Sequence, residues 1–198
     1  MSQKQRGRSL YGSQLPPNEQ REAFTSGEVP VAVYGLGKMG LPLAAVYADV
    51  SGNVVGVDVD PDVVEVVRAG GCHVSGEPGL PELVADLVER GAFHATTDAS
   101  SAAADATVHV VIVPTLITDD GEPDLSAVVD VVEGVGGGLD AGDTVVLEST
   151  VPPRTCTDLV DPLLEWQSGL SPQQYGLAFC PERTKSGQAL ADVRGTHP

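Results

Sequence analysis

The sequence predicts an α/β fold: a doubly wound parallel sheet of about six strands in a three-layer αβα arrangement. Short apolar runs alternate with segments of helical spacing between residues 29 and 179. The composition agrees, because 41% of the residues are hydrophobic, only 4% are aromatic, and small residues suit closely packed layers. A glycine-rich turn follows the first apolar run, where such folds connect a strand to a helix.

The predicted strands are short and rich in valine, which is typical of strands buried on both faces of a parallel sheet. They cover residues 29–34, 53–58, 93–97, 108–113, 143–149 and 175–179. The predicted helices cover residues 38–48, 61–69, 80–90, 99–104, 125–134 and 155–167. Because strand and helix alternate, we expect right-handed crossovers between parallel strands.

Two predicted helices carry capping residues at their start. Asp60 precedes Pro61, which combines an N-cap with proline at the first helical position, and Asp124 can cap the helix after it. Residues 1–27 are polar and lack sustained periodicity, so we expect a mobile or loosely docked extension. A single domain is expected at residues 28–198.

The stretch Gly35-Leu36-Gly37-Lys38-Met39-Gly40 has the pattern G-x-G-x-x-G, after a predicted strand and at the start of a predicted helix. In this context the pattern indicates a dinucleotide site, to which all six residues are assigned. Gly35 would allow the tight turn, Gly37 would let a pyrophosphate approach, and Gly40 would let helix and strand pack closely. Free N–H groups at the helix start would bind the phosphates. The other interpretation is a glycine-rich turn with no ligand.

An acidic residue at the end of the second strand completes the fingerprint, because it can bind the adenosine ribose. Asp58 ends the second predicted strand 18 residues after Gly40. Asp60 is the competitor, and its place before Pro61 explains it as a helix cap. A carboxylate at Asp58 would repel a 2′-phosphate, so we expect NAD as the cofactor rather than NADP.

The charge balance is strongly acidic, with 28 acidic and 11 basic residues and a formal net charge of -17. This excludes nucleic acid as a partner, because phosphate binding needs clustered lysine and arginine. An acidic, lysine-poor surface is typical of proteins from high-salt cytoplasm. We therefore expect a halophilic source.

The cysteines and histidines form no metal pattern. Three cysteines are widely spaced without a CxxC pair, which indicates neither a zinc site nor a disulfide framework. His73 and His94 have no partners at metal spacing, and His109 lies in an apolar strand as an expected core residue. The start of the chain lacks an apolar signal core, and no apolar run has the length of a membrane span. We expect a cytoplasmic protein that binds neither metal nor membrane.

Further motifs accompany the glycine fingerprint in order along the chain. They are GLGKMGLPLAAVYA with VVGVDVDP, VIVPT followed by DGEPDLS, ESTVPPRT, and CPERTKSG. Together they resemble the N-terminal part of the UDP-glucose/GDP-mannose dehydrogenase family, in particular its branch that oxidises N-acetylated sugars such as UDP-N-acetylmannosamine. The resemblance implies an NAD-dependent, four-electron oxidation that converts the C6 alcohol of a nucleotide sugar to a carboxylate through a cysteine thioester.

The resemblance also implies roles for residues after the later strands. Thr115 would lie beside the cofactor, Glu148 at the cofactor side of a strand end, and Thr150 near the nicotinamide, where it helps to orient the catalytic water. Glu182 would act as acid/base or position the water, and Arg183 would hold the neighbouring loop or the substrate. Ligands bind at these strand ends in open parallel sheets. The other interpretation makes the two threonines turn caps and Glu148 a solvated charge.

The family's later G-x-C-x-P-K-D segment, with the catalytic cysteine, does not occur in these 198 residues. The resemblance therefore implies an NAD-binding part that lacks the central and C-terminal family domains and cannot form the thioester alone. The family forms homodimers, and this state is not carried over. The alternatives are a stand-alone NAD-binding module, a UDP-glucose or GDP-mannose 6-dehydrogenase, or a 3-hydroxyacid type of dehydrogenase. ESTVPPRT and CPERTKSG favour the nucleotide-sugar enzymes.

Overall fold

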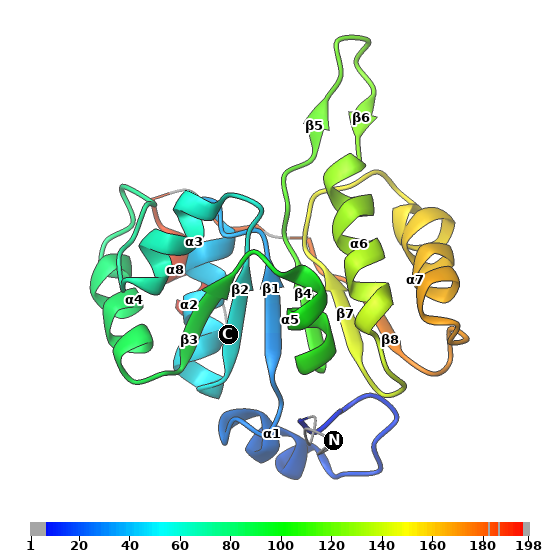
Figure 1. Cartoon of the computed structure of the whole chain (residues 1–198), viewed down its shortest axis with the longest axis horizontal. Coiled ribbons are helices and arrows are strands. Elements are labelled where there is room, and N and C mark those ends of the chain that lie inside the picture. Colours follow the sequence, from blue (N-terminus) through cyan, green and yellow to red (C-terminus); the bar gives the residue numbers. More distant parts are fainter. Residues whose placement is uncertain (1–6, 182, 186, 196–198) are drawn as a thin grey trace.

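The computed structural model describes residues 7–181, 183–185 and 187–195, and its centre is a six-stranded parallel sheet (Figure 1). The sheet order is β3-β2-β1-β4-β7-β8. The strands are β1 (Val31–Tyr34), β2 (Val54–Val57), β3 (Phe93–Thr96), β4 (Val108–Val111), β7 (Thr144–Leu147) and β8 (Gly176–Phe179). This order confirms the predicted doubly wound, Rossmann-type sheet.

Helices cover both faces of the sheet (Figure 1). One face carries α2 (Gly40–Ser51), α3 (Pro61–Arg68), α4 (Leu80–Glu89) and α8 (Ala189–Gly195). The other face carries α5 (Ala99–Asp105), α6 (Ser126–Gly138) and α7 (Asp161–Ser168). Successive residues of β1 point to opposite faces, so Val33 joins the first hydrophobic cluster and Tyr34 joins the second. The chain thus forms three layers, as predicted.

The predicted helix caps are present. Asp60 accepts a hydrogen bond from the Asp62 N–H at the start of α3. The Asp124 carboxylate accepts one from the Ser126 N–H at 2.9 Å, and this bond lowers the pKa of Asp124. The helix after Asp124 begins at Ser126, one residue later than expected.

The prediction of one continuous α-helix over residues 155–167 is wrong. A π-helical turn (Cys156–Val160) leads into α7, which begins at Asp161 and ends at Ser168. Pro162 explains the interruption, because proline has no N–H with which to bond the carbonyl four residues earlier.

Burial on both faces holds for β1, β2 and most of β4, is partial in β7, and is wrong at the edges of the sheet. In β3 the side chain of His94 is exposed, and in β8 Ala178 and Phe179 are exposed. These strands have a neighbour on one side only, and the helical layers do not extend fully over them.

The sequence patterns missed a short hairpin between β4 and α6. Strand β5 (Leu116–Ile117) pairs antiparallel with β6 (Pro123–Asp124), and the hairpin projects beyond the carboxyl edge of the sheet (Figure 1). Leu116 and Ile117 are 63% and 68% exposed. Two-residue strands are too short to leave an alternating pattern in the sequence.

The polar N-terminal extension has more structure than its composition indicated. Helix α1 (Pro17–Thr25) packs on α2 below the amino ends of the strands (Figure 1). Before this helix, the Arg8 N–H donates to the Glu28 carbonyl at 2.7 Å, and the Thr107 hydroxyl donates to the Arg8 carbonyl at 3.0 Å. The Ser9 hydroxyl contacts the buried Asp143 carboxylate at 3.3 Å. Residues 7–28 therefore lie along the bottom of the sheet.

His109 is the buried core histidine that the sequence predicts, with no exposed surface. Its Nδ1 lies 3.3 Å from the Tyr34 hydroxyl, and its Nε2 lies 3.7 Å from the Asp143 carboxylate. This polar chain connects the central strand β4 with the loop before β7.

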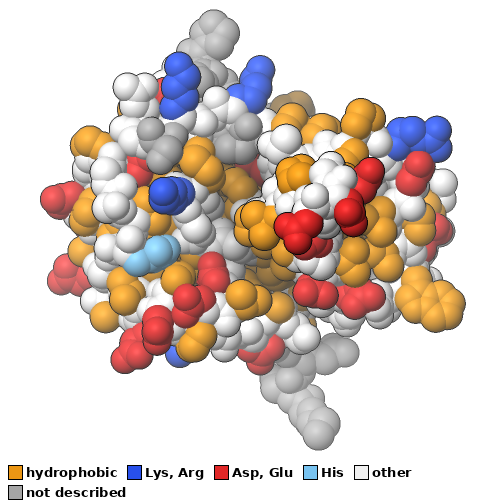
Figure 2. All heavy atoms as spheres, turned by 90° about the horizontal axis from the view of Figure 1, so that it is seen from above, with side chains coloured by type: hydrophobic (Ala, Val, Ile, Leu, Met, Phe, Trp, Pro, Cys, Tyr) orange, Lys and Arg blue, Asp and Glu red, His pale blue; other side chains and the backbone are white. Residues whose placement is uncertain are grey.

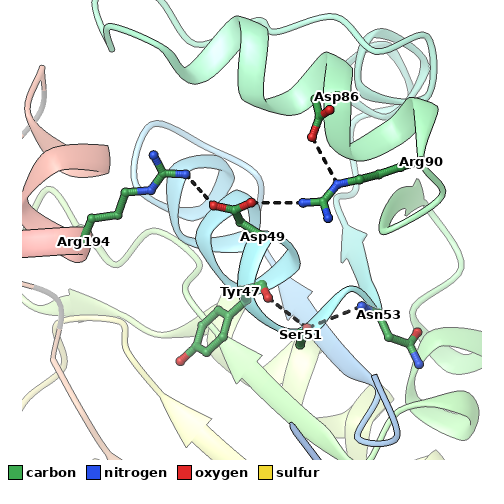
Figure 3. Close-up of polar contacts among 7 residues, drawn as sticks. All are labelled: Tyr47, Asp49, Ser51, Asn53, Asp86, Arg90 and Arg194. Atoms are coloured by element: carbon green, nitrogen blue, oxygen red, sulfur yellow. Dashed lines mark hydrogen bonds and ion pairs between the residues drawn. The ribbon is translucent and has the colours of Figure 1, made fainter. Parts of the chain in front are cut away.

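A group of charged side chains connects three helices of the first face (Figure 3). Asp49 of α2 accepts from Arg90, which follows α4, at 3.0 Å and from Arg194 of α8 at 2.6 Å. The Arg90 Nε also pairs with Asp86 at 3.1 Å. Such partly exposed pairs each contribute roughly 0–1 kcal/mol. Their main effect here is to orient α8 against α2.

The glycines at the end of α6 predict two substitutions of opposite sign. A Cβ at Gly138 would lie 2.8 Å from Ala103, whereas a Cβ at Gly137 would have no neighbour within 4 Å. Gly138→Ala should lower the free energy of unfolding by about 1–3 kcal/mol through overpacking. Gly137→Ala should raise it by roughly 0.5–1 kcal/mol, because alanine loses less conformational entropy in a helix. Thermal unfolding of both variants measures this, and shifts of the same sign would contradict the packing of α6 on α5.

Candidate cofactor site

A cavity of about 720 Å³ opens at the carboxyl ends of β1, β2, β4 and β7. The chain leaves the neighbouring strands β1 and β4 toward opposite sides of the sheet, which is where open α/β sheets bind ligands. Figure 2 looks down on this edge and shows the surface hollowed beside the projecting hairpin, with hydrophobic side chains around the hollow. The volume suits a small organic ligand.

The three glycines of the turn after β1 differ in what surrounds them. Gly35 has a left-handed φ of 98°, and a Cβ there would lie 2.7 Å from the Ile112 carbonyl oxygen. A Cβ at Gly40 would lie 1.8 Å from the carbonyl oxygen of Gly35. Packing therefore requires both glycines. Gly37 lines the cavity, lies outside the left-handed region, and has no atom within 4 Å of an added Cβ. Nothing in the described chain explains why Gly37 lacks a side chain.

The other residues of the turn face different ways. Leu36 is fully buried in the core, so its backbone alone can meet a ligand. Lys38 and Met39 line the cavity, and the Lys38 side chain is exposed. Gly40, the first residue of α2, also lines the cavity, and its N–H bonds no acceptor among the described residues, which favours an anionic ligand there. The N–H groups of Leu41 and Leu43 donate to the carbonyls of Gly37 and Met39.

Asp58, at the end of β2, lies beside the glycine turn. Its Oδ2 accepts from the Leu36 N–H at 2.8 Å, and its Oδ1 accepts from the Asp60 N–H at 3.0 Å. Asp58 also lines the cavity, whereas Asp60 is exposed and caps α3. Of the two candidate carboxylates, the fold brings Asp58 to the cavity.

Two side-chain hydrogen bonds connect the loops after β4 and β7. The Thr115 hydroxyl donates to the Thr150 carbonyl at 2.7 Å, and the Ser149 hydroxyl donates to the Val113 carbonyl at 2.7 Å. Thr115 and Thr150 both line the cavity. The Thr115 hydroxyl therefore binds the neighbouring loop, as expected of a residue that stabilises a turn. Thr115 nevertheless remains part of the cavity wall.

Glu148 lines the cavity from the end of β7 and is only 5% exposed. The Tyr47 hydroxyl of α2 donates to its Oε1 at 3.4 Å. The interpretation of Glu148 as a solvated strand-end charge is therefore wrong. Its carboxylate lies between the end of β7 and α2, at the wall of the cavity.

Of the CPERTKSG segment, Glu182 lies outside the described residues. Arg183 is exposed, and Thr184 lines the cavity. The fold therefore brings the segment that follows β8 to the same opening as the glycine turn.

Sequence reasoning missed the hydrophobic wall of the cavity. Its members come from β2 and the loop after it, from the loop after β4, and from α6; they are Val57, Val59, Val113, Pro114, Ala127 and Val131. A valine that lines a ligand cavity has the same pattern in the sequence as one that packs in the core. Val59 alone carries a signal, because it stands between two aspartates, and it is 92% exposed.

The described residues show neither a membrane span nor a metal cluster. None of the described helices is both long and apolar enough to cross a membrane. No cluster of three or more His, Cys, Asp or Glu side chains is placed to hold a metal ion within the part of the chain described.

Similar proteins agree with this geometry. The UDP-N-acetyl-D-mannosamine dehydrogenase of Yersinia pestis is 38% identical over 170 residues, which are 82% of this chain and 39% of that protein. Among solved structures, GDP-mannose dehydrogenase from Pseudomonas aeruginosa superposes with a TM-score of 0.80 at 29% identity, over 83% of this chain and 38% of that one. UDP-D-ManNAc dehydrogenase from Pyrococcus horikoshii has a TM-score of 0.78 at 30% identity, over 83% and 39%.

The chain thus spans about two fifths of the length of these relatives. The matching segment contains the glycine turn, Asp58 and the loops that line the cavity. The family model described as "UDP-glucose/GDP-mannose dehydrogenase family, NAD binding domain" matches residues 29–197. The chain therefore belongs to the UDP-glucose/GDP-mannose dehydrogenase family and contains its NAD-binding domain.

Proposed function

We propose that NAD binds in the cavity with its adenosine ribose at Asp58 and its pyrophosphate at Gly37, Lys38 and the start of α2. The carrying observation is the space beside Gly37, where no atom of the described residues lies within 4 Å of an added Cβ. Val59 and the hydrophobic wall suit the adenine ring. The nicotinamide then extends toward Thr115, Glu148 and Thr150 at the other side of the cavity.

We further propose that this domain serves a nucleotide-sugar 6-dehydrogenase, in which bound NAD accepts hydride from an alcohol carbon. UDP-N-acetylmannosamine is the favoured sugar, because the relatives from Yersinia pestis and Pyrococcus horikoshii carry that substrate in their names. The likeness to a GDP-mannose dehydrogenase keeps the hexose enzymes as the alternative. Thr150 and Glu182 remain the proposed catalytic residues. Their proposed roles are to orient a water molecule and to transfer a proton beside the reacting carbon.

The activity proposed for residues 1–198 by themselves is cofactor binding. The cysteine segment through which the family forms its thioester does not occur in them. A stand-alone NAD-binding module is therefore the second candidate. Thr184 beside the cavity favours the dehydrogenase, because it brings the CPERTKSG segment to the cofactor. We propose residues 28–198 as the cofactor domain, residues 1–27 as its extension, and the cytoplasm, where NAD and nucleotide sugars occur, as the compartment.

Gly37→Ala tests the pyrophosphate site. The added methyl group should meet no protein atom and should leave the fold intact, yet it would occupy the space of the pyrophosphate. We expect the dissociation constant for NAD to rise at least about tenfold, which corresponds to roughly 1.4 kcal/mol. Isothermal titration calorimetry measures this. Gly137→Ala is the matched control, because it also adds a methyl group in open space but lies on α6. Unchanged affinity in the Gly37 variant would return the glycine turn to a purely structural role.

Asp58→Ala tests the ribose contact and the choice of cofactor. Loss of a charge-assisted hydrogen bond should weaken NAD binding by about 1.5–3 kcal/mol, and loss of the negative charge should reduce the discrimination against NADP. Titrations with both cofactors measure the two effects. Asp60→Ala is the control, since it removes the cap of α3 and should lower stability by about 1 kcal/mol without changing cofactor affinity. An Asp58 variant with wild-type affinity for both cofactors would remove that carboxylate from the site.

The acidic surface supports the proposal of a halophilic source. A net charge of -17 repels itself in dilute salt, and this repulsion is screened as ionic strength rises. We expect the melting temperature to increase between about 0.1 M and about 3 M KCl. Calorimetric scans of this chain and of a control protein with near-zero net charge, in the same KCl series, separate charge screening from the general stabilising effect of salt. A melting temperature that does not respond to KCl, or that falls, would contradict the proposal.

A further inference from the structure

The loop between α3 and α4 touches the glycine turn through a histidine that the sequence analysis left unassigned. The Nε2 of His73 lies 2.8 Å from the carbonyl oxygen of Leu36. A carbonyl oxygen only accepts hydrogen bonds, so the Nε2 of His73 must carry the hydrogen and donate it. His73 therefore holds the peptide group that joins Leu36 to Gly37.

This contact fixes the direction of an N–H group. In a trans peptide the C=O of one residue and the N–H of the next point in opposite directions. Because the Leu36 carbonyl points at His73, the Gly37 N–H points the other way. Gly37 lines the cavity, and among the described residues no acceptor bonds its N–H. The Gly37 N–H is thus free to donate to a ligand anion.

Without the contact to His73, the peptide after Leu36 could rotate, because it turns about the φ angle of Gly37 and glycine adopts many backbone angles at little cost. The Leu41 N–H bonds the next peptide of the turn, at the Gly37 carbonyl, and not this one. After such a rotation, the Leu36 carbonyl would replace the Gly37 N–H and repel a phosphate. Asp58 already holds the Leu36 N–H on the other side of that residue. Asp58 and His73 thus bind the N–H and the carbonyl group of Leu36, respectively.

His73 is exposed, but the residues that follow it in the loop are anchored. Val74 is buried in the first hydrophobic cluster. Glu77, only 4% exposed, accepts from the Ala189 N–H at 3.0 Å and from the Gly187 N–H. These contacts fix the loop against α8 and hold the imidazole over the glycine turn.

We propose that His73 is a positioning residue for the cofactor pyrophosphate: it holds the Leu36–Gly37 peptide so that the Gly37 N–H donates into the cavity. The inference rests on the cofactor site proposed above and adds a residue that the G-x-G-x-x-G pattern does not contain. It requires a donor at position 73 rather than an imidazole as such.

The test compares ligands with and without a pyrophosphate. Dissociation constants for NAD, ADP-ribose and adenosine are measured by calorimetry or NMR shifts for the wild-type chain, His73→Ala and His73→Gln. We expect His73→Ala to raise the dissociation constants for NAD and ADP-ribose about tenfold and to change the constant for adenosine by less than about twofold. Glutamine keeps an N–H donor at similar reach, so His73→Gln should stay within about threefold for all three ligands. His94→Ala, the matched control at the edge strand β3, should change none of them.

Three results would overturn the inference. They are unchanged NAD affinity in His73→Ala, an equal loss for adenosine, which indicates general damage to the loop, and a glutamine variant as weak as the alanine variant. Failure of the proposed function itself is distinguishable, because then the wild-type chain would not bind NAD or ADP-ribose at all.

Discussion

Gly40 and Gly35 approach so closely that no side chain fits between them, and the geometry of the site depends on this contact. A Cβ at Gly40 would lie 1.8 Å from the Gly35 carbonyl oxygen. Because Gly40 has no side chain, α2 begins directly against the turn after β1, and Gly40 itself lines the cavity. The same helix carries Tyr47 to Glu148. It also carries Asp49 to Arg90, which follows α4, and to Arg194 of α8 (Figure 3). One steric requirement thus positions the phosphate end of the cavity and the helix behind it.

Short hydrogen bonds within the protein hold the rest of the cavity. Asp58 and His73 hold the glycine turn, and Thr115 and Ser149 join the loops after β4 and β7. These bonds are made by the protein's own groups and hold the loops in place at the cavity. Such preorganisation reduces the entropic cost of binding. The hydrophobic wall adds apolar area, while the few polar groups decide how a ligand is oriented.

The sequence predicted the sheet well because each central strand is an apolar run between turn residues, and the crossover rule then leaves little choice of topology. It also selected the cavity residues from the glycine turn, Asp58 and the loops after β4 and β7. It could not predict the π-helical turn before Pro162 or the hairpin of two-residue strands, because neither has a period to detect. His73 escaped for another reason: its partner is a backbone carbonyl 37 residues away, and a backbone partner leaves no mark in the sequence. Glu148 needed the fold as well, since its burial and its contact with Tyr47 of α2 arise only once the helix packs on the sheet.

The most direct test follows the backbone amides while NAD is added. In a 15N-labelled sample, we expect the Gly37 amide signal to shift and saturate with NAD, together with signals at the start of α2 and at Asp58. Amides at the amino ends of the strands, such as Thr107, should stay in place. Saturable shifts confined to other parts of the chain, or a Gly37 signal that does not respond to NAD, would contradict the claim that this cavity binds the cofactor through its pyrophosphate.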